Sequence, residues 1–369
     1  MHIKHTIFLV LLLFPALTIQ AANRYWEYGD YLDLHPKQRA LTEHFSALVD
    51  NDPIAFSGEV NKPITVSIVY PSEQISDYWV RNISAFTQRL NELGIPHEIS
   101  AFFSSPNTNQ RRQNEQLLEA LQSEPDYLIF TLDTERHRIF IEHVLQSPTT
   151  KLILQNITTP IKSWNKNQPF FYVGFDHHQG THLLADYFQS IFPDSATYNL
   201  LYFSPGYISN ARGDTFINRL QPSQRYWPES IYYTRADQQS GYDATMLMLE
   251  QKADVDFIYA CSTDIALGAA KALAEKNLNS QIMLNGWGGG SAELAALANG
   301  KIDVTVMRIN DDAGVAMAEA IKLDLENHPV PLVYSGNLEL ITKHDSIEHI
   351  NALKKRAFRY SDNQKWTTQ

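Results

Sequence analysis

The chain has 369 residues, with 41 acidic against 30 basic side chains and a formal net charge of −11. This acidic balance argues against nucleic acid and against an anionic membrane surface as partners. The length suffices for about two domains with hydrophobic cores of their own. The single cysteine, Cys261, cannot form an internal disulfide, and its apolar neighbourhood (FIYACS) predicts a small buried hydrophobic residue.

The first 22 residues have the pattern of a secretory signal peptide. A short basic start is followed by an apolar stretch from Thr6 to Ile19, and then by small residues at Ala21 and Ala22. The apolar stretch is short and interrupted by proline, which disfavours a membrane span and leaves an uncleaved anchor as the alternative. No cysteine stands in the position of a lipid-attachment site. We therefore expect a protein exported to the periplasm, without direct membrane insertion.

Residues 23–62 are rich in aromatic and charged side chains without strand periodicity, and we predict an N-terminal arm that is helical near 37–50. Short apolar runs with β-forming residues then recur about every 20–33 residues, the spacing of βα units that feed a parallel sheet. The predicted strands are 64–70, 97–103, 127–131, 151–156, 171–176, 197–204, 230–234, 257–262, 282–287 and 304–308.

Amphipathic helices are predicted between these strands. In 77–93, large apolar residues from Trp79 to Leu93 follow one another at steps of four and three, so they share one helix face, and Gly94 ends the helix. Similar patterns occupy 134–147, 177–191, 240–251, 263–276 and 311–325.

The fold class that follows is α/β, with two doubly wound parallel-sheet domains and a ligand cleft between them. Ten strands suit two sheets better than one. The strands are apolar on both faces, which predicts helices on both faces of each sheet. The expected domains comprise 63–175 plus 309–336, and 176–308 plus 337–369.

Candidate binding residues stand just after the strands, because ligands of open α/β sheets bind beyond the carboxyl ends of strands. These positions carry polar, aromatic and guanidinium groups spread around the ring of strand ends, an arrangement that encloses a small polar ligand. They include Gln74, Trp79, Asn156, Arg212, Ser262, Thr263, Trp287 and Arg308.

The segment GWGGGS (286–291) is not a nucleotide loop. It lacks the G-x-G-x-x-G register, Asp303 stands at the wrong distance for a ribose-binding acid, and no G-K-[ST] sequence occurs in the chain. We expect its glycines to let the backbone turn sharply while Trp287 projects into the cleft and covers the face of a ring-shaped ligand. A core tryptophan is the alternative.

Arg212 and Arg308 indicate a ligand that is anionic or rich in oxygen acceptors, because each guanidinium presents a planar set of donors. The alternative is an interdomain salt bridge to Asp133 or Asp176.

Two other patterns carry less weight. The histidines at 177, 178 and 182 lack the glutamate of H-E-x-x-H, so we expect no metal site there and interpret the stretch as the first turn of a surface helix. Ser262-Thr263-Asp264 lacks the G-x-S-x-G turn of a hydrolase. Ser262 and Thr263 are better explained as a helix N-cap that also binds ligand. No catalytic residue is predicted.

Several motifs together carry a resemblance. The chain resembles the ribose- and galactose-type periplasmic binding proteins over most of 63–345. From about residue 25 to 363 it is more closely similar to the LuxP-type periplasmic receptors for the quorum-sensing signal autoinducer-2. The motifs are VYPSEQISDYWVRN, DYLIFTLDTERHR, KLILQNITTP, FYVGFDH, GYISNARGDTFI, DVDFIYACSTDIALGA, NGWGGGSAEL, TVMRINDDAGVAMAEAIK and ALKKRAFRYSDN.

This resemblance implies a ligand site made of Gln74, Ser76, Trp79, Asn156, Arg212, Ser262, Thr263, Trp287 and Arg308. The implied ligand is a furanosyl borate diester, so borate enters as part of the ligand and no separate cofactor is expected. The arginines would neutralise the boron-centred charge, the tryptophans would cover ring faces, and Gln74, Asn156 and Thr263 would hold hydroxyls. The implied partner is the periplasmic domain of a LuxQ-type membrane sensor kinase.

Three other functions stay open at this point. A pentose- or hexose-binding protein of an importer shares the fold. A secreted glycosidase needs two facing carboxylates, for which only Asp133 and Asp264 stand at strand ends. A repressor core of the same fold is disfavoured by the signal sequence and by the absence of an N-terminal helix-turn-helix pattern.

Overall fold

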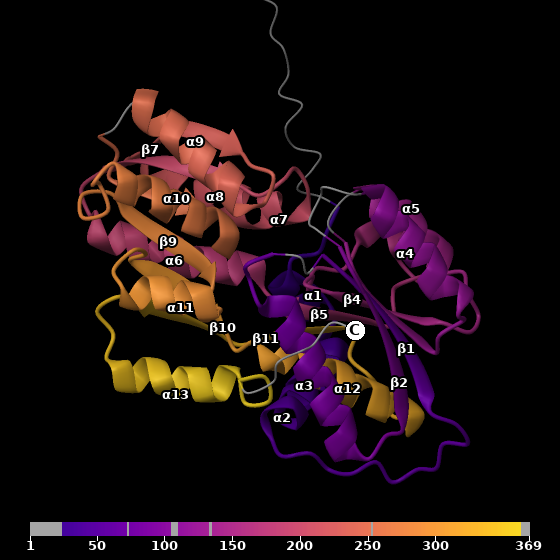
Figure 1. Ribbon diagram of the computed structural model, residues 1–369. Helices are drawn as coiled ribbons and strands as arrows, with labels where there is room; N and C mark the ends of the chain where they lie inside the picture. Colours follow the sequence, from indigo (N-terminus) through magenta and orange to yellow (C-terminus); the bar gives the residue numbers. More distant parts are fainter. Residues whose placement is uncertain (1–23, 72–73, 105–109, 133–134, 252–253, 363–369) are drawn as a thin grey trace, which may run out of the picture.

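Two six-stranded sheets, each flanked by helices, form two lobes that lie side by side (Figure 1). The computed structural model describes residues 24–71, 74–104, 110–132, 135–251 and 254–362. The predicted signal peptide lies outside these residues. The architecture confirms the predicted fold class, two doubly wound α/β lobes with a cleft between them.

The first sheet has the strand order β11-β5-β4-β3-β1-β2, and all its neighbouring strands are parallel. Buried residues of α3 and α12 cover one face of the sheet, and residues of α4 and α5 cover the other. The elements are β1 (Ile64–Tyr70), α3 (Tyr78–Leu93), β2 (His97–Phe103), α4 (Gln110–Gln122), β3 (Tyr127–Thr131), α5 (Glu135–Val144), β4 (Lys151–Gln155), η1 (Lys162–Trp164), β5 (Phe171–Phe175), α12 (Asp311–Leu325) and β11 (Val333–Gly336).

The second sheet has the order β12-β10-β9-β8-β6-β7, in which β12 runs antiparallel to β10. Buried residues of α6 and α8 cover one face, and those of α9, α10, α11 and α13 cover the other. The elements are α6 (His177–Ile191), β6 (Ala196–Tyr202), α7 (Tyr207–Ser209), η2 (Asn210–Asp214), α8 (Thr215–Leu220), η3 (Gln221–Ser223), β7 (Tyr226–Tyr233), α9 (Gln238–Gln251), β8 (Phe257–Ala260), α10 (Thr263–Glu275), β9 (Met283–Gly288), α11 (Ser291–Ala298), β10 (Val304–Arg308), β12 (Leu338–Thr342) and α13 (Ile347–Ala357).

All ten predicted strands are present, and two short ones were missed. In the stretch 333–342, β11 joins the first sheet and β12 joins the second, with only Asn337 between them. The hydrophobic pattern of so short a segment does not show that it serves two sheets. Helices cover both faces of each sheet, as predicted, although the edge strand β7 leaves Trp227 and Ile231 about half exposed.

The N-terminal arm packs on the first lobe through two helices, α1 (Tyr28–Leu34) and α2 (Pro36–Asp50). The predicted helix near 37–50 is thereby confirmed, and Phe45 on α2 is buried in the core of the first lobe. The predicted end of α3 is also confirmed, since Gly94 adopts the left-handed conformation (φ +70°) that favours glycine.

The chain passes between the lobes after β5, after β10 and between β11 and β12. Beyond α13, the tail of residues 358–362 contacts both lobes: Phe358 is buried in the core of the second lobe, and Tyr360 packs on the core of the first. The exact limits of the two domains stay a prediction.

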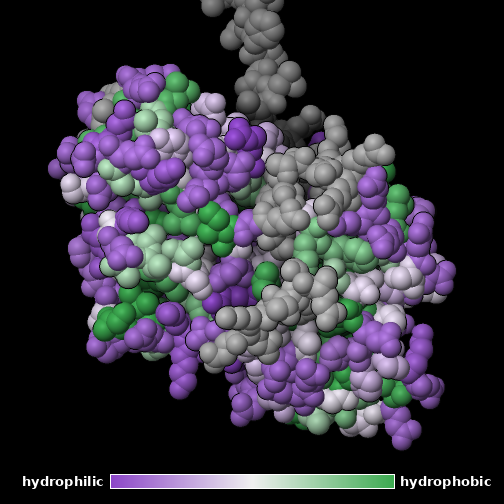
Figure 2. Space-filling model, viewed as in Figure 1, coloured by the Kyte–Doolittle hydropathy of each residue, from purple (hydrophilic) through white to green (hydrophobic). Residues whose placement is uncertain are grey.

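The face seen in Figure 2 is mostly hydrophilic, with hydrophobic side chains in separate groups. Within the described ranges, no helix combines the length and the apolar character that crossing a membrane requires.

A buried arginine connects four segments of the first lobe. Arg89 on α3 is 1% exposed and donates from Nε to Glu319 Oε1 on α12 at 2.7 Å. Its remaining nitrogens donate to the backbone oxygens of Leu48 and Asn51 and to the Tyr360 hydroxyl, each at 3.0 Å. One side chain thus fixes α3 against α12, the end of α2 and the tail.

We expect Arg89→Met to lower the free energy of unfolding by about 3–5 kcal/mol, because it leaves the Glu319 carboxylate buried without its cation. Urea denaturation followed by circular dichroism measures the effect. The control is Arg39→Met, whose exposed ion pair with Asp33 should contribute under about 1 kcal/mol. Equal losses in the two variants would contradict this role for Arg89.

Candidate ligand-binding cleft

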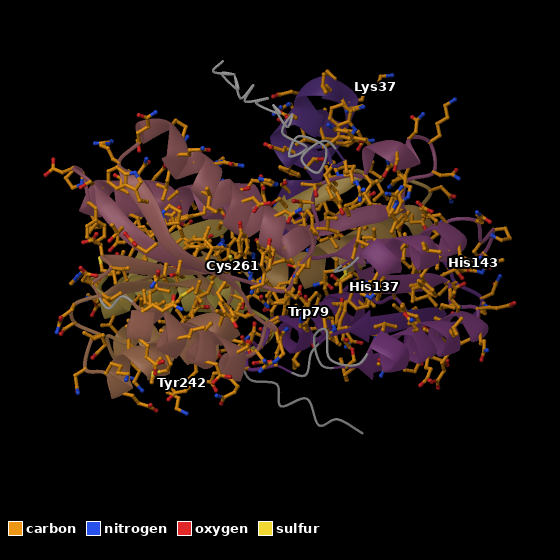
Figure 3. The ribbon with its side chains drawn as sticks, turned by 90° about the horizontal axis from the view of Figure 1, so that it is seen from above. Lys37, Trp79, His137, His143, Tyr242 and Cys261 are labelled. Atoms are coloured by element: carbon orange, nitrogen blue, oxygen red, sulfur yellow. The ribbon has the colours of Figure 1, made fainter. Side chains whose placement is uncertain are left out.

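A cavity lies between the two lobes at the carboxyl ends of their strands. The cavity is small: the volume open to a water molecule is about 50 Å³. The two lobes therefore stand close together. Seen from above, Trp79 lies near the boundary between them (Figure 3). All nine predicted site residues line it: Gln74, Ser76, Trp79, Asn156, Arg212, Ser262, Thr263, Trp287 and Arg308. That each contacts a ligand stays a prediction.

Arg212 reaches the cavity from η2, a five-residue π-helix between α7 and α8. Such π-turns occur often at functional sites. The guanidinium lies 3.6 Å from the centre of the Trp287 ring and donates from Nη1 to the Cys261 carbonyl at 2.7 Å. Burial and the nearby Arg308 lower the pKa of Arg212 to about 9, so it is still charged at neutral pH.

Arg308 ends β10 and lines the same cavity. Its guanidinium carbon lies 4.0 Å from the centre of the Tyr78 ring and 5.9 Å from that of Trp287. Burial lowers the pKa of Arg308. Two arginines, 4% and 5% exposed, therefore face one small cavity.

No carboxylate among the described residues forms an ion pair with either of these arginines. The alternative partner Asp176 uses its carboxylate to accept from the His178 and Gln179 amides at the start of α6. Asp133, the other alternative, lies outside the described residues.

The glycine-rich segment at the end of β9 brings Trp287 and Arg308 together. Gly288 and Gly289 have φ values of +141° and +68°, which side-chain-bearing residues rarely adopt. A Cβ atom at Gly288 would also lie 2.5 Å from the Arg308 guanidinium, and one at Gly286 would collide with the carboxylate of Glu293. Trp287 is fully buried and lines the cavity, so these glycines make room for side chains.

Glu293 holds this turn in place, and the sequence analysis missed it. Its Oε2 accepts from the Gly289 amide at 2.8 Å and from Thr263 Oγ1 at 2.9 Å, while Oε1 accepts from Thr305 Oγ1 at 2.8 Å. Burial raises the pKa of Glu293. A glutamate at the third position of a helix, reaching back to its start, is a known capping signal that could have identified it.

The stretch forms the first turn of α6, as predicted, but the side chain of His177 itself is fully buried. Its Nε2 pairs with the backbone oxygen of Asn156 at 3.1 Å and must donate, which leaves Nδ1 to accept from Arg212 at 3.3–3.4 Å. His178 instead contacts Thr215 Oγ1. No cluster of three or more metal-binding side chains occurs within the described part of the chain.

Four buried polar atoms of cavity-lining residues have no hydrogen-bond partner among the described residues: Asn156 Oδ1, Ser262 Oγ, Trp287 Nε1 and Arg308 Nε. A buried polar atom without a partner costs about 1–3 kcal/mol, and a polar ligand would supply the missing bonds. Ser262 precedes α10 but its side chain makes no capping bond, so the expected N-cap bond is absent and its hydroxyl remains available.

Two other cavity residues have structural partners. Tyr78 packs under Arg308, and its hydroxyl accepts from Gln155 Nε2 at 3.3 Å. Both oxygens of Asp264 accept backbone N–H bonds, from Ile75 at 2.8 Å and Ser76 at 3.1 Å. The only described acid of the supposed glycosidase pair therefore joins the lobes instead of facing a substrate.

Cys261 lies directly behind Arg212. It is fully buried, and burial raises the pKa of its thiol to about 12. The prediction of a small buried hydrophobic residue is confirmed. Its backbone carbonyl, which accepts from Arg212, contributes to the site.

A family model described as a periplasmic binding protein domain matches residues 66–328, more than two thirds of the chain. The chain belongs to this family. Its members are solute-binding proteins that typically act outside the cytoplasm, and this periplasmic binding protein is not an enzyme.

Solved structures of the same fold include three informative relatives of this binding protein. A carbohydrate-transporter solute-binding protein from Agrobacterium radiobacter, in complex with D-arabinose, has a TM-score of 0.70 at 16% identity and covers 80% of this chain and 99% of its own. The glucose-galactose binding protein GanP from Geobacillus stearothermophilus has a TM-score of 0.69 at 17% identity, and the match covers 78% of this chain and 100% of GanP. A chain of the XylFII–LytSN complex has a TM-score of 0.66 at 13% identity, and the match covers 78% of this chain and 100% of that chain.

His177 provides a test of the site's electrostatics. Burial and then Arg212 lower its pKa well below 6.5, so the folded protein binds fewer protons than the unfolded chain below pH 6.5. Stability should therefore fall as the pH falls through that range. His177→Gln keeps a donor and an acceptor but does not titrate.

We expect urea midpoints of the wild-type protein to fall more than those of His177→Gln between pH 7.5 and pH 5.5. The other histidines are common to both proteins, so their effects cancel in the difference. The same pH dependence in both proteins would contradict a neutral buried His177.

Proposed function

We propose that this protein is a receptor for the furanosyl borate diester form of autoinducer-2, and that binding closes the two lobes around it. The observation that carries the proposal is the pair of buried guanidiniums, Arg212 and Arg308, which face one small cavity without an ion-paired carboxylate among the described residues. Buried cations need an anionic partner or strong acceptors, and the ligand is the group that can supply them.

The remaining cavity chemistry fits a small sugar-like molecule. Asn156 and Ser262 offer unpartnered polar atoms to hydroxyl groups, and Trp79 and Trp287 give the cavity aromatic walls. A tetrahedral borate adds one negative charge to such a sugar-like ring, and Arg212 and Arg308 would neutralise it. Two of the motifs that resemble the autoinducer-2 receptors, VYPSEQISDYWVRN and NGWGGGSAEL, supply four of the nine predicted site residues.

A neutral pentose or hexose bound for import is the second candidate. Structures of similar fold include solute-binding proteins with bound D-arabinose and D-allose and a periplasmic ribose transporter protein, and these descriptions favour a sugar over a signal molecule. At 15–19% identity these likenesses concern the fold. A neutral sugar would bring no charge to Arg212 and Arg308, which is why we place the borate diester first.

The readout we propose is a membrane sensor kinase of the LuxQ type. A ligand that binds both lobes shifts the balance toward the closed form by its differential affinity for that form. The kinase's periplasmic domain would then distinguish the closed shape from the open one. The XylFII–LytSN complex shows that a binding protein of this fold forms an assembly with another protein.

The first test is to purify the protein from the periplasm, release its bound small molecule by heating, and analyse it for boron and for signalling activity. We expect about one boron per protein, because the proposed ligand contains one boron atom and the lobes enclose one cavity at their strand ends. A boron-free pentose or hexose in the released material would establish the second candidate instead.

The second test replaces the arginines. Arg212→Ala and Arg308→Ala should each weaken binding of the furanosyl borate diester by about 2–4 kcal/mol in titration calorimetry, because each removes a charge-assisted contact. The control is Arg219→Ala, whose half-exposed side chain pairs with Asp186 on the surface of the second lobe. An arginine variant that binds within about twofold of wild type would remove that residue from the site.

A further inference from the structure

A group of contacts outside the cavity joins the two lobes. Asp77, just before α3 in the first lobe, accepts at Oδ2 from Ser291 Oγ at 2.7 Å and from the Ser291 amide at 3.3 Å, at the start of α11 in the second lobe. Arg81 on α3 donates from Nη2 to the same Ser291 hydroxyl at 2.8 Å. None of these three residues lines the cavity.

Arg81 uses every nitrogen of its guanidinium, each toward a different segment. Nε donates to Asp77 Oδ2 at 2.7 Å, Nη2 to Ser291 on α11, and Nη1 to Ser361 Oγ in the tail at 2.9 Å. The guanidinium also lies 3.8 Å from the centre of the Phe358 ring. A planar guanidinium has fixed donor directions, so this set of bonds requires the relative position of the lobes seen in this structure.

The tail is itself tied to the segment that leaves the cavity. Ser361 donates from its hydroxyl and its amide to the two carboxylate oxygens of Asp311, at 2.7 and 3.0 Å. Asp311 is the first residue of α12, three positions after Arg308. A continuous chain of hydrogen bonds therefore runs from Ser291 through Arg81 and Ser361 to the start of α12.

Gly290 supplies an independent observation. Its φ of −73° is open to any residue, so backbone conformation does not explain the glycine. A Cβ atom there would instead collide with Asp77 Oδ1 from the other lobe. Asp77 cannot easily move away, because Arg81 and Ser291 hold its carboxylate. A side chain at position 290 is therefore excluded only while the lobes are closed.

Asp77 is charged in this arrangement. Burial acts to raise its pKa, but the charge and hydrogen bond of Arg81, together with the bonds from Ser291, outweigh burial and lower the pKa below its usual range. The group thus contains a charge-assisted bond between Asp77 and Arg81, with the Ser291 hydroxyl bridging to the other lobe.

We propose that Asp77, Arg81, Gly290 and Ser291 form a latch, which holds the lobes closed and sets ligand affinity without touching the ligand. This inference rests on the proposed binding by closure, but it is independent of which ligand binds. Observed affinity falls with the fraction of protein that can close, so damage to the latch weakens binding even though the cavity is intact.

The test measures lobe separation and affinity together. Cysteines placed at the exposed residues Leu118 on α4 and Leu247 on α9 carry spin labels on opposite lobes, while the buried Cys261 stays unlabelled. Pulsed electron paramagnetic resonance gives the distance between labels, without ligand and with the furanosyl borate diester, D-ribose, D-arabinose or D-galactose. Titration calorimetry gives the affinities.

The latch variants are Arg81→Met and Gly290→Ala. Their matched controls are Arg219→Met, which breaks an ion pair within the second lobe, and Gly29→Ala, where an added Cβ has open space. We expect the latch variants to shift the label distance toward the open form and to bind about tenfold more weakly, while the controls match wild type. Urea midpoints of both latch variants should stay close to those of their controls.

Latch variants that show the wild-type distance distribution and bind within about twofold would overturn the inference. A wild-type protein that remains open under every condition would also overturn it. If a neutral sugar closes the wild type and the borate diester does not, the proposed ligand is wrong, and the latch is then judged with that sugar.

Discussion

The structure depends on one electrostatic constraint, the burial of two like charges in one small cavity. Arg212 and Arg308 are 4% and 5% exposed, and burial lowers the pKa of each. Desolvation disfavours both charges, so neighbouring groups must compensate for lost water. The Cys261 carbonyl and the Trp287 ring do so for Arg212, and the Tyr78 ring for Arg308. These groups do not neutralise the positive charge of the two arginines, so the cavity attracts an anion.

The local structure around the arginines follows from this constraint. The guanidinium of Arg308 needs the space that a side chain at position 288 would fill, and the turn that provides it needs the left-handed conformations of Gly288 and Gly289. The carboxylate of Glu293 then fastens that turn to Thr263 and Thr305. A glycine-rich loop thus serves to position cations, whereas in nucleotide-binding proteins such loops surround phosphate.

Bonds between the lobes connect the cavity to the outer shape of the molecule. Asp264 fastens the loop before α3 to the second lobe from within the cleft, through the amides of Ile75 and Ser76. Arg81 joins the two lobes from outside the cleft, and it also donates a hydrogen bond to the C-terminal tail. These bonds come from both lobes, so they depend on lobe position, and under the function proposed above they would couple that position to ligand binding.

The sequence by itself determined the ten main strands and eight of the side chains that line the cleft, because parallel strands end at one edge of a sheet and strand-end residues must meet there. The family resemblance added Ser76. Only the tertiary structure decided the roles of His177, Glu293 and Arg81 and the division of 333–342 between two sheets. Hydrophobic periodicity reports which face of a segment is buried. It does not report which distant segment packs on that face, and each of these roles depends on such a partner.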